Sequence, residues 1–134
     1  MEHRIRFIEH AGRAILLMDF SEVWRVDAAA SLIEEARRVV GGQAREQKLL
    51  VLVHVTDSAF DDRVLRKLKE LAVHDEPWVL ASAVVGMRGM QKVVYRLVAS
   101  FSGRKLAAFD GLEEAKNWLV AQRRPPETVP GPKP

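Results

Sequence analysis

The sequence contains no cysteine, which excludes disulfide bonds, thiolate nucleophiles and zinc sites built from cysteine. It also lacks long hydrophobic runs, and a run such as LLVLV at residues 49–53 is far too short to cross a bilayer. The first ten residues, MEHRIRFIEH, carry charges where a signal peptide needs an apolar centre. These absences together predict a cytoplasmic protein that is neither secreted nor membrane-spanning.

Neither positive nor negative charge is in large excess in most of the chain. The net charge is +3, and residues 123–134 hold three basic residues against one acidic residue. The rest of the chain therefore has 18 basic and 17 acidic residues, and such a balance argues against nucleic-acid binding. The exception is the stretch from Arg88 to Lys105, which contains five basic residues and no acidic one.

The length of 134 residues suits one domain that buries its own core. The end of the chain, residues 123–134 with the sequence RRPPETVPGPKP, is rich in proline and nearly free of apolar side chains. Such a segment cannot add to a core. We therefore predict one domain over residues 1–122, followed by a disordered tail over residues 123–134.

Strand-like and helix-like segments alternate along this domain. Apolar β-type segments predict a hairpin and three further strands, at residues 4–10, 14–20, 48–55, 78–86 and 105–110. Apolar residues at helical spacing predict helices at residues 26–42, 61–74, 90–101 and 112–122. This alternation is typical of an α/β fold with several parallel strands.

With the elements placed, the chain from about residue 14 to residue 119 resembles the STAS-like domains, a bacterial group also labelled STAS/SEC14-like and related to anti-sigma-factor antagonists. The resemblance rests on the segments ILLMDFSEV, LLVLVHVTDSAFD, SAVVG, FSGR and FDGLEEAKNWL. It implies a single-layer mixed β-sheet of about five strands, with helices packed mainly on one side. It also implies a non-enzymatic module that acts through a protein partner or a bound ligand.

An Asp–Ser pair follows the predicted strand at residues 48–55, in the stretch HVTDSAFDDR. In partner-switching STAS domains, a serine at this place is phosphorylated by a kinase, so the resemblance makes Ser58, or Thr56, the candidate regulatory position. The usual motif continues with a small polar residue and glycine, whereas this chain continues with alanine and phenylalanine. The residues alone favour another interpretation, because Ser58 and Asp61 approximate a capping box at a helix start.

A second candidate site follows the next predicted strand, where Gly86, Arg88 and Gly89 precede a helix. Glycines at such a junction let the backbone approach a ligand, and the helix start favours an anion. A tight turn that requires glycine is the simpler interpretation. Arg88, Lys92 and Arg96 then recur every four residues and form a basic stripe. Such a stripe suits phosphate, acidic lipid headgroups or an acidic protein surface, unless it is merely solvated.

The two candidate sites lie at the same edge of the sheet if the two strands before them are parallel. We expect this edge, which includes Asp57, to be the partner- or ligand-binding surface. Trp24 interrupts a polar strand-to-helix connection. It is either an exposed partner anchor or a cover for the end of the core.

Catalysis and metal binding have little support in the sequence. No pair of histidines has metal-ligand spacing, and no cofactor is expected. His54 lies in a predicted buried strand, and Asp19, at the end of the preceding strand, could orient it. The favoured function is a regulatory protein-binding module, and the alternative is a module that binds an anionic small ligand or lipid headgroup. The first hairpin leaves an edge strand open to homodimerisation, which nothing in the sequence requires.

Overall fold

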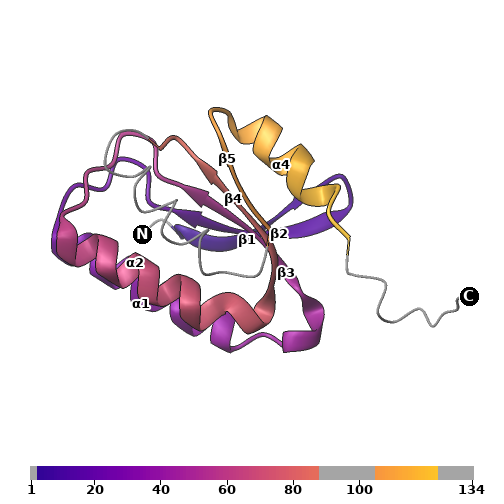
Figure 1. Cartoon of the computed structure of the whole chain (residues 1–134), viewed down its shortest axis with the longest axis horizontal. Coiled ribbons are helices and arrows are strands. Elements are labelled where there is room, and N and C mark those ends of the chain that lie inside the picture. Colours follow the sequence, from indigo (N-terminus) through magenta and orange to yellow (C-terminus); the bar gives the residue numbers. More distant parts are fainter. Residues whose placement is uncertain (1–2, 88–104, 124–134) are drawn as a thin grey trace, which may run out of the picture.

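A computed structural model describes residues 3–87 and 105–123. Five strands form one sheet in the order β1-β2-β3-β4-β5 (Figure 1). The first two strands pair antiparallel as a hairpin, and each later neighbouring pair is parallel. The predicted mixed sheet is therefore confirmed. The strands are β1 (Ile5–His10), β2 (Arg13–Asp19), β3 (Leu49–His54), β4 (Val79–Val85) and β5 (Lys105–Phe109).

Helices cover both faces of this sheet, unequally. In Figure 1, α1 and α2 lie side by side on one face and the shorter α4 lies on the other. The bounds of these helices are α1 (Val26–Gly41), α2 (Asp62–Asp75) and α4 (Leu112–Val120), and the 3-10 turns are η1 (Arg45–Gln47) and η2 (Glu76–Trp78). The predicted helix at residues 90–101 and the tail from residue 124 onward lie outside the described residues. Within the described ranges, no helix is both long enough and apolar enough to span a membrane.

The central strands are buried on both faces, which explains why their sequences show no alternation. In β2, Leu16 and Met18 face α1 and α2, whereas Ile15 and Leu17 face α4. In β3, Val51 likewise faces α1 and α2, whereas Leu52 faces α4. Two apolar clusters result, and the sheet separates them.

Candidate functional site

The carboxyl ends of β2, β3 and β4 meet at one edge of the sheet. β3 and β4 are parallel, and the Val55 N–H donates to the Val85 carbonyl at 2.9 Å. Gly86 lies directly against Thr56: a Cβ built on Gly86 would be 2.1 Å from Thr56 Oγ1. The predicted meeting of these two connections is confirmed. We call residues 20–25, 55–60 and 86–87 the rim.

Backbone hydrogen bonds between its connections hold the rim together. Phe20 N–H donates to the His54 carbonyl at 2.8 Å, and Glu22 N–H donates to the Thr56 carbonyl at 2.9 Å. The Ala59 N–H donates to the Val23 carbonyl at 3.1 Å. Two non-glycine residues of these connections, Glu22 and Asp57, have a left-handed φ of 59°. The rim is therefore a set of defined turns rather than a loose loop cluster.

Trp24 projects from the rim into solvent. Trp24 is 70% exposed, yet its indole N–H donates to the Asp57 carbonyl at 2.7 Å. Its neighbour Arg25 pairs with Asp27 at 3.2 Å instead of stacking on the ring. Within the described part of the chain, no aromatic ring or cation packs on the Trp24 ring. The interpretation of Trp24 as a cover for the core is therefore wrong, and the exposed position is the one observed.

Ser58 closes a turn and does not cap a helix. Its hydroxyl donates to the Val55 carbonyl at 2.6 Å, and its N–H donates to the same carbonyl at 3.2 Å. The cap of α2 is Asp61, whose carboxylate accepts from the Val64 N–H at 3.0 Å. That hydrogen bond is the main cause that lowers the pKa of Asp61. The capping role predicted for Ser58 is wrong, because the helix starts beyond the reach of its side chain.

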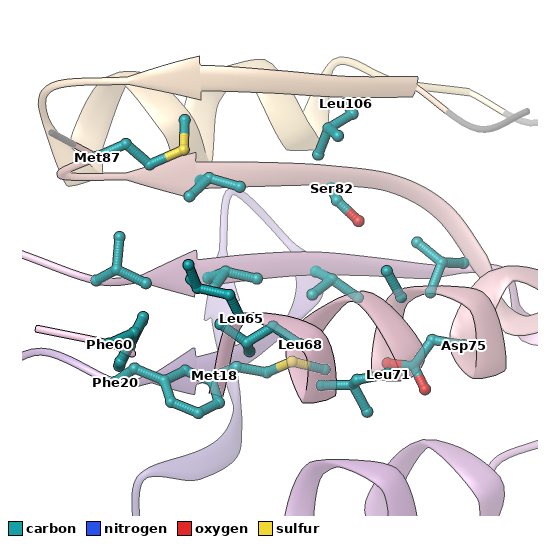
Figure 2. A pocket seen from close by; sticks show the side chains of 16 residues that line it. Met18, Phe20, Phe60, Leu65, Leu68, Leu71, Asp75, Ser82, Met87 and Leu106 are labelled. Atoms are coloured by element: carbon teal, nitrogen blue, oxygen red, sulfur yellow. The ribbon is translucent and has the colours of Figure 1, made fainter. Parts of the chain in front are cut away.

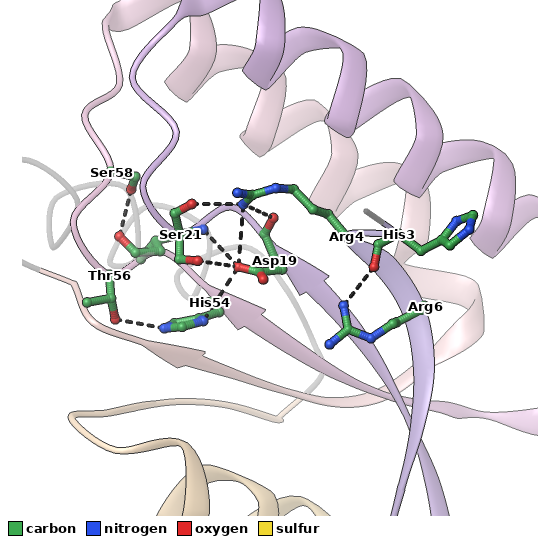
Figure 3. A network of polar contacts seen from close by, with 9 residues as sticks. His3, Arg4, Arg6, Asp19, Ser21, His54, Thr56 and Ser58 are labelled. Atoms are coloured by element: carbon green, nitrogen blue, oxygen red, sulfur yellow. Dashed lines mark hydrogen bonds and ion pairs between the residues drawn. The ribbon is translucent and has the colours of Figure 1, made fainter. Parts of the chain in front are cut away.

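A polar network lies beside the rim, at the ends of β2 and β3 (Figure 3). The Asp19 carboxylate accepts from the Ser21 hydroxyl at 2.6 Å and from the Ser21 N–H at 3.0 Å. Arg4 Nη1 donates to the Ser21 carbonyl at 2.8 Å. Burial by itself would raise the pKa of Asp19, but the Ser21 hydrogen bonds and the charges of His54 and Arg4 lower it. The network thus keeps a half-buried carboxylate ionised.

His54 lies between Asp19 and Thr56. Its Nδ1 is 3.5 Å from Asp19 Oδ1, and its Nε2 is 3.0 Å from Thr56 Oγ1. The first distance is too long for a hydrogen bond in a catalytic relay, and the Thr56 hydroxyl is packed against Gly86. This arrangement ties strand ends together. Within residues 3–87 and 105–123, no three His, Asp or Glu side chains converge to hold a metal ion.

Four of the predicted binding residues cannot be placed in this site. Arg88, Gly89, Lys92 and Arg96 lie outside the described residues. The basic stripe that they form in the sequence therefore stays a prediction, as does the anion-binding alternative that depends on it.

An apolar cavity of about 110 Å³ lies between α2 and the sheet (Figure 2). Sequence reasoning missed it, because a cavity depends on how well facing side chains fill space rather than on any motif. The only sequence signal is the presence of small or polar residues in otherwise apolar segments, such as Ala72 in α2 and Ser82 in β4.

Comparison with known proteins establishes the fold. No family model matches the chain, and no curated protein matches it. The structure is similar to that of an uncharacterized protein of the DUF3478 family, with a SpoIIAA-like fold, from Shewanella loihica PV-4. The match covers 86% of this chain and 91% of that one, with a TM-score of 0.66 and 14% sequence identity. This chain therefore has a SpoIIAA-like fold, the STAS fold of anti-sigma-factor antagonists, which confirms the resemblance at the level of fold.

Proposed function

We propose that this chain is a non-enzymatic regulatory module that binds a protein partner through the rim. Trp24 is the anchor of the interaction, and Ser58 is the position at which phosphorylation alters binding. The observation that carries the proposal is a tryptophan that is 70% exposed and yet fixed by a hydrogen bond at 2.7 Å. The SpoIIAA-like fold supports the proposal, because anti-sigma-factor antagonists share this fold.

Trp24 has the physical properties of a binding hot spot. Its indole offers a large apolar surface, and tryptophan is among the residues that contribute most to protein interfaces. Its bond to the Asp57 carbonyl and the backbone bonds around it reduce the conformational freedom that binding would otherwise remove. An anchor prepared in this way favours a protein partner with an apolar pocket.

The turn at Ser58 connects the candidate switch to the anchor. A phosphoryl group on Ser58 Oγ removes the hydroxyl hydrogen, so the bond to the Val55 carbonyl is lost. The added charge also meets the carboxylates of Asp57 and Asp61, which repel it. Because the Asp57 carbonyl holds the Trp24 indole, a rearranged turn changes the anchor.

Thr56 is the weaker of the two candidate switches. Its hydroxyl is hydrogen-bonded to His54 and lies against the backbone of Gly86. A phosphoryl group there would have to displace the Gly86 backbone that follows β4, whereas the structure of the described residues gives no such backbone approach at Ser58. The geometry therefore favours Ser58.

A photo-crosslinking amino acid introduced at position 25, beside the intact Trp24, tests the proposal directly. The full chain is expressed with this residue in place of Arg25, whose side chain is 80% exposed, and a matched variant carries it in place of Val73, which is 52% exposed on α2. We expect one protein to crosslink from position 25 and not from position 73. The crosslinked yield should fall more with Ser58→Asp than with Ser58→Ala, because both variants lose the hydrogen bond to the Val55 carbonyl and only the first adds negative charge.

Two results would contradict the proposal. One is the absence of any specific crosslink from position 25, and the other is the same set of crosslinked proteins from both positions. Crosslinking to a second copy of this chain would identify the partner as the chain itself, which size-exclusion chromatography of the wild type and Trp24→Ala then checks.

A further inference from the structure

The cavity between α2 and the sheet is apolar except at two of its lining residues. Its wall combines side chains of β2, β3, β4, β5 and α2, and it contains no basic group among the described residues. Figure 2 shows Phe20, Met18 and Leu68 among the apolar groups around it. The two polar lining residues are Asp75 in α2 and Ser82 in β4, and they are only 3% and 4% exposed.

Ser82 is the unexplained feature of this wall. Its side chain projects from β4 towards α2, into the cavity (Figure 2). No hydrogen bond of this hydroxyl is found in the structure of the described residues. Buried hydroxyl groups are nearly always hydrogen-bonded, because an unpaired one loses its bonds to water without replacement. A bound molecule with a hydrogen-bonding group would supply the missing partner.

We propose that this cavity binds a small uncharged molecule that is mostly apolar and carries one hydroxyl or carbonyl group. The apolar wall selects a hydrocarbon body, and the Ser82 hydroxyl hydrogen-bonds its single polar group. An anionic ligand is disfavoured, because the cavity is also lined by Asp75.

The volume limits the size of this molecule. An engineered apolar cavity of about 150 Å³ binds benzene, and the present cavity measures about 110 Å³. One aromatic ring or a short branched chain is therefore the upper limit of what the cavity encloses. This site goes beyond the proposed function and does not depend on it, since Trp24 is absent from the cavity wall.

Phenol and benzene are suitable probes, because they share a ring and differ by one hydroxyl group. Each is titrated into the full chain while methyl signals are followed by NMR. We expect saturable shifts at Met18, Leu68 and Val84, which line the cavity. Methyl groups of the opposite apolar cluster, such as those of Leu52 and Leu119, serve as the internal control.

Two pairs of variants identify the groups responsible. Ser82→Ala should weaken phenol binding about threefold to tenfold, the usual contribution of one hydrogen bond, and leave benzene binding unchanged. Ser31→Ala, at an exposed position of α1, is its control. Ala72→Leu fills the cavity and should abolish binding of both probes, whereas Ala28→Leu, on the exposed surface of α1, should not.

Three results would overturn the proposal. They are no saturable shift at the cavity methyl groups with millimolar probe, equal shifts at both apolar clusters, and an unchanged phenol-to-benzene ratio in Ser82→Ala. The wild-type titration decides the first two even if a variant fails to fold. Trp24→Ala should retain probe binding, so failure of this proposal is distinguishable from failure of the proposed function.

Discussion

Two tryptophans at opposite ends of the parallel strands make the same hydrogen bond in different surroundings. Trp24 donates its indole N–H to the Asp57 carbonyl at 2.7 Å, and Trp78 donates to the Gln43 carbonyl at 2.9 Å. The Trp78 ring is stacked on His74 at 5.2 Å between centroids, and the Arg45 guanidinium lies 4.8 Å from its centre. The Trp24 ring has no such cover among the described residues and is 70% exposed.

The difference distinguishes Trp78, which packs within the fold, from Trp24, whose apolar surface is available to a partner. At the amino end of the parallel strands, the ring of Trp78 packs between the connection that follows α1 and the end of α2. Packing within the fold therefore accounts for this tryptophan. At the rim, the hydrogen bond orients Trp24 but leaves its apolar surface in water. Apolar surface that is held in place and left uncovered is what an interface uses.

The largest effect that we expect at the rim is the cost of a side chain at Gly86. A Cβ there would lie 2.8 Å from the Thr56 backbone, and its φ of 91° strains any other residue. Gly86→Ala should lower the free energy of unfolding by about 3 kcal/mol in urea denaturation.

Gly12, in the hairpin turn between β1 and β2, is the matched control. Its φ is 81°, but nothing lies within 4 Å of a Cβ built on it. Gly12→Ala should therefore cost only the backbone strain, about 1 kcal/mol. Equal losses at the two glycines would mean that the close approach of Gly86 to Thr56 does not contribute to stability.

Removal of each tryptophan sharpens the comparison between the two ends. Trp78→Ala leaves a gap between His74 and Arg45 and should cost about 2 kcal/mol of unfolding free energy. Trp24→Ala removes a side chain that contacts little of the core and should cost less than about 1 kcal/mol. Chemical denaturation of both variants checks this, and a larger loss for Trp24→Ala would return Trp24 to a structural role.

The smallest effect that we expect is a change in acid sensitivity at Asp19, in the polar network beside the rim. Its pKa in the folded protein is below the ordinary value, so the ionised carboxylate stabilises the fold above the unfolded pKa of about 3.9. This contribution is lost as the pH falls through the folded pKa. Urea denaturation across this range should show a shallower acid loss for Asp19→Asn than for the wild type. Parallel curves would contradict the role assigned to the network.

Hydrophobic patterning predicts most of the fold, because the buried faces of strands and helices leave periodic signals in the sequence. The apolar segments at residues 48–55 and 78–86 correspond to β3 and β4, with their ends displaced by one residue. The meeting of the two connections at the rim follows from the parallel pairing of these strands. By contrast, the amphipathic pattern of α4 indicates a buried side but not which face of the sheet it covers.

The details of the site depend on contacts that leave no local signal. Trp24 and the Asp57 carbonyl are 33 positions apart, and a main-chain acceptor cannot be recognised from residue type. Ser58 and Asp61 are both residues that cap helices, and only the point at which α2 begins decides between them. The packing of Gly86 on Thr56 likewise requires the register of two strands.

The affinity of the crosslinked partner for the wild type, Trp24→Ala and Val73→Ala tests the central claim most directly. Isothermal titration calorimetry on the three purified proteins supplies it. We expect Trp24→Ala to weaken binding at least about tenfold, as removal of a hot-spot side chain does, and Val73→Ala to stay within about twofold of the wild type. Equal affinities for the wild type and Trp24→Ala would contradict the claim that the rim is the partner-binding surface.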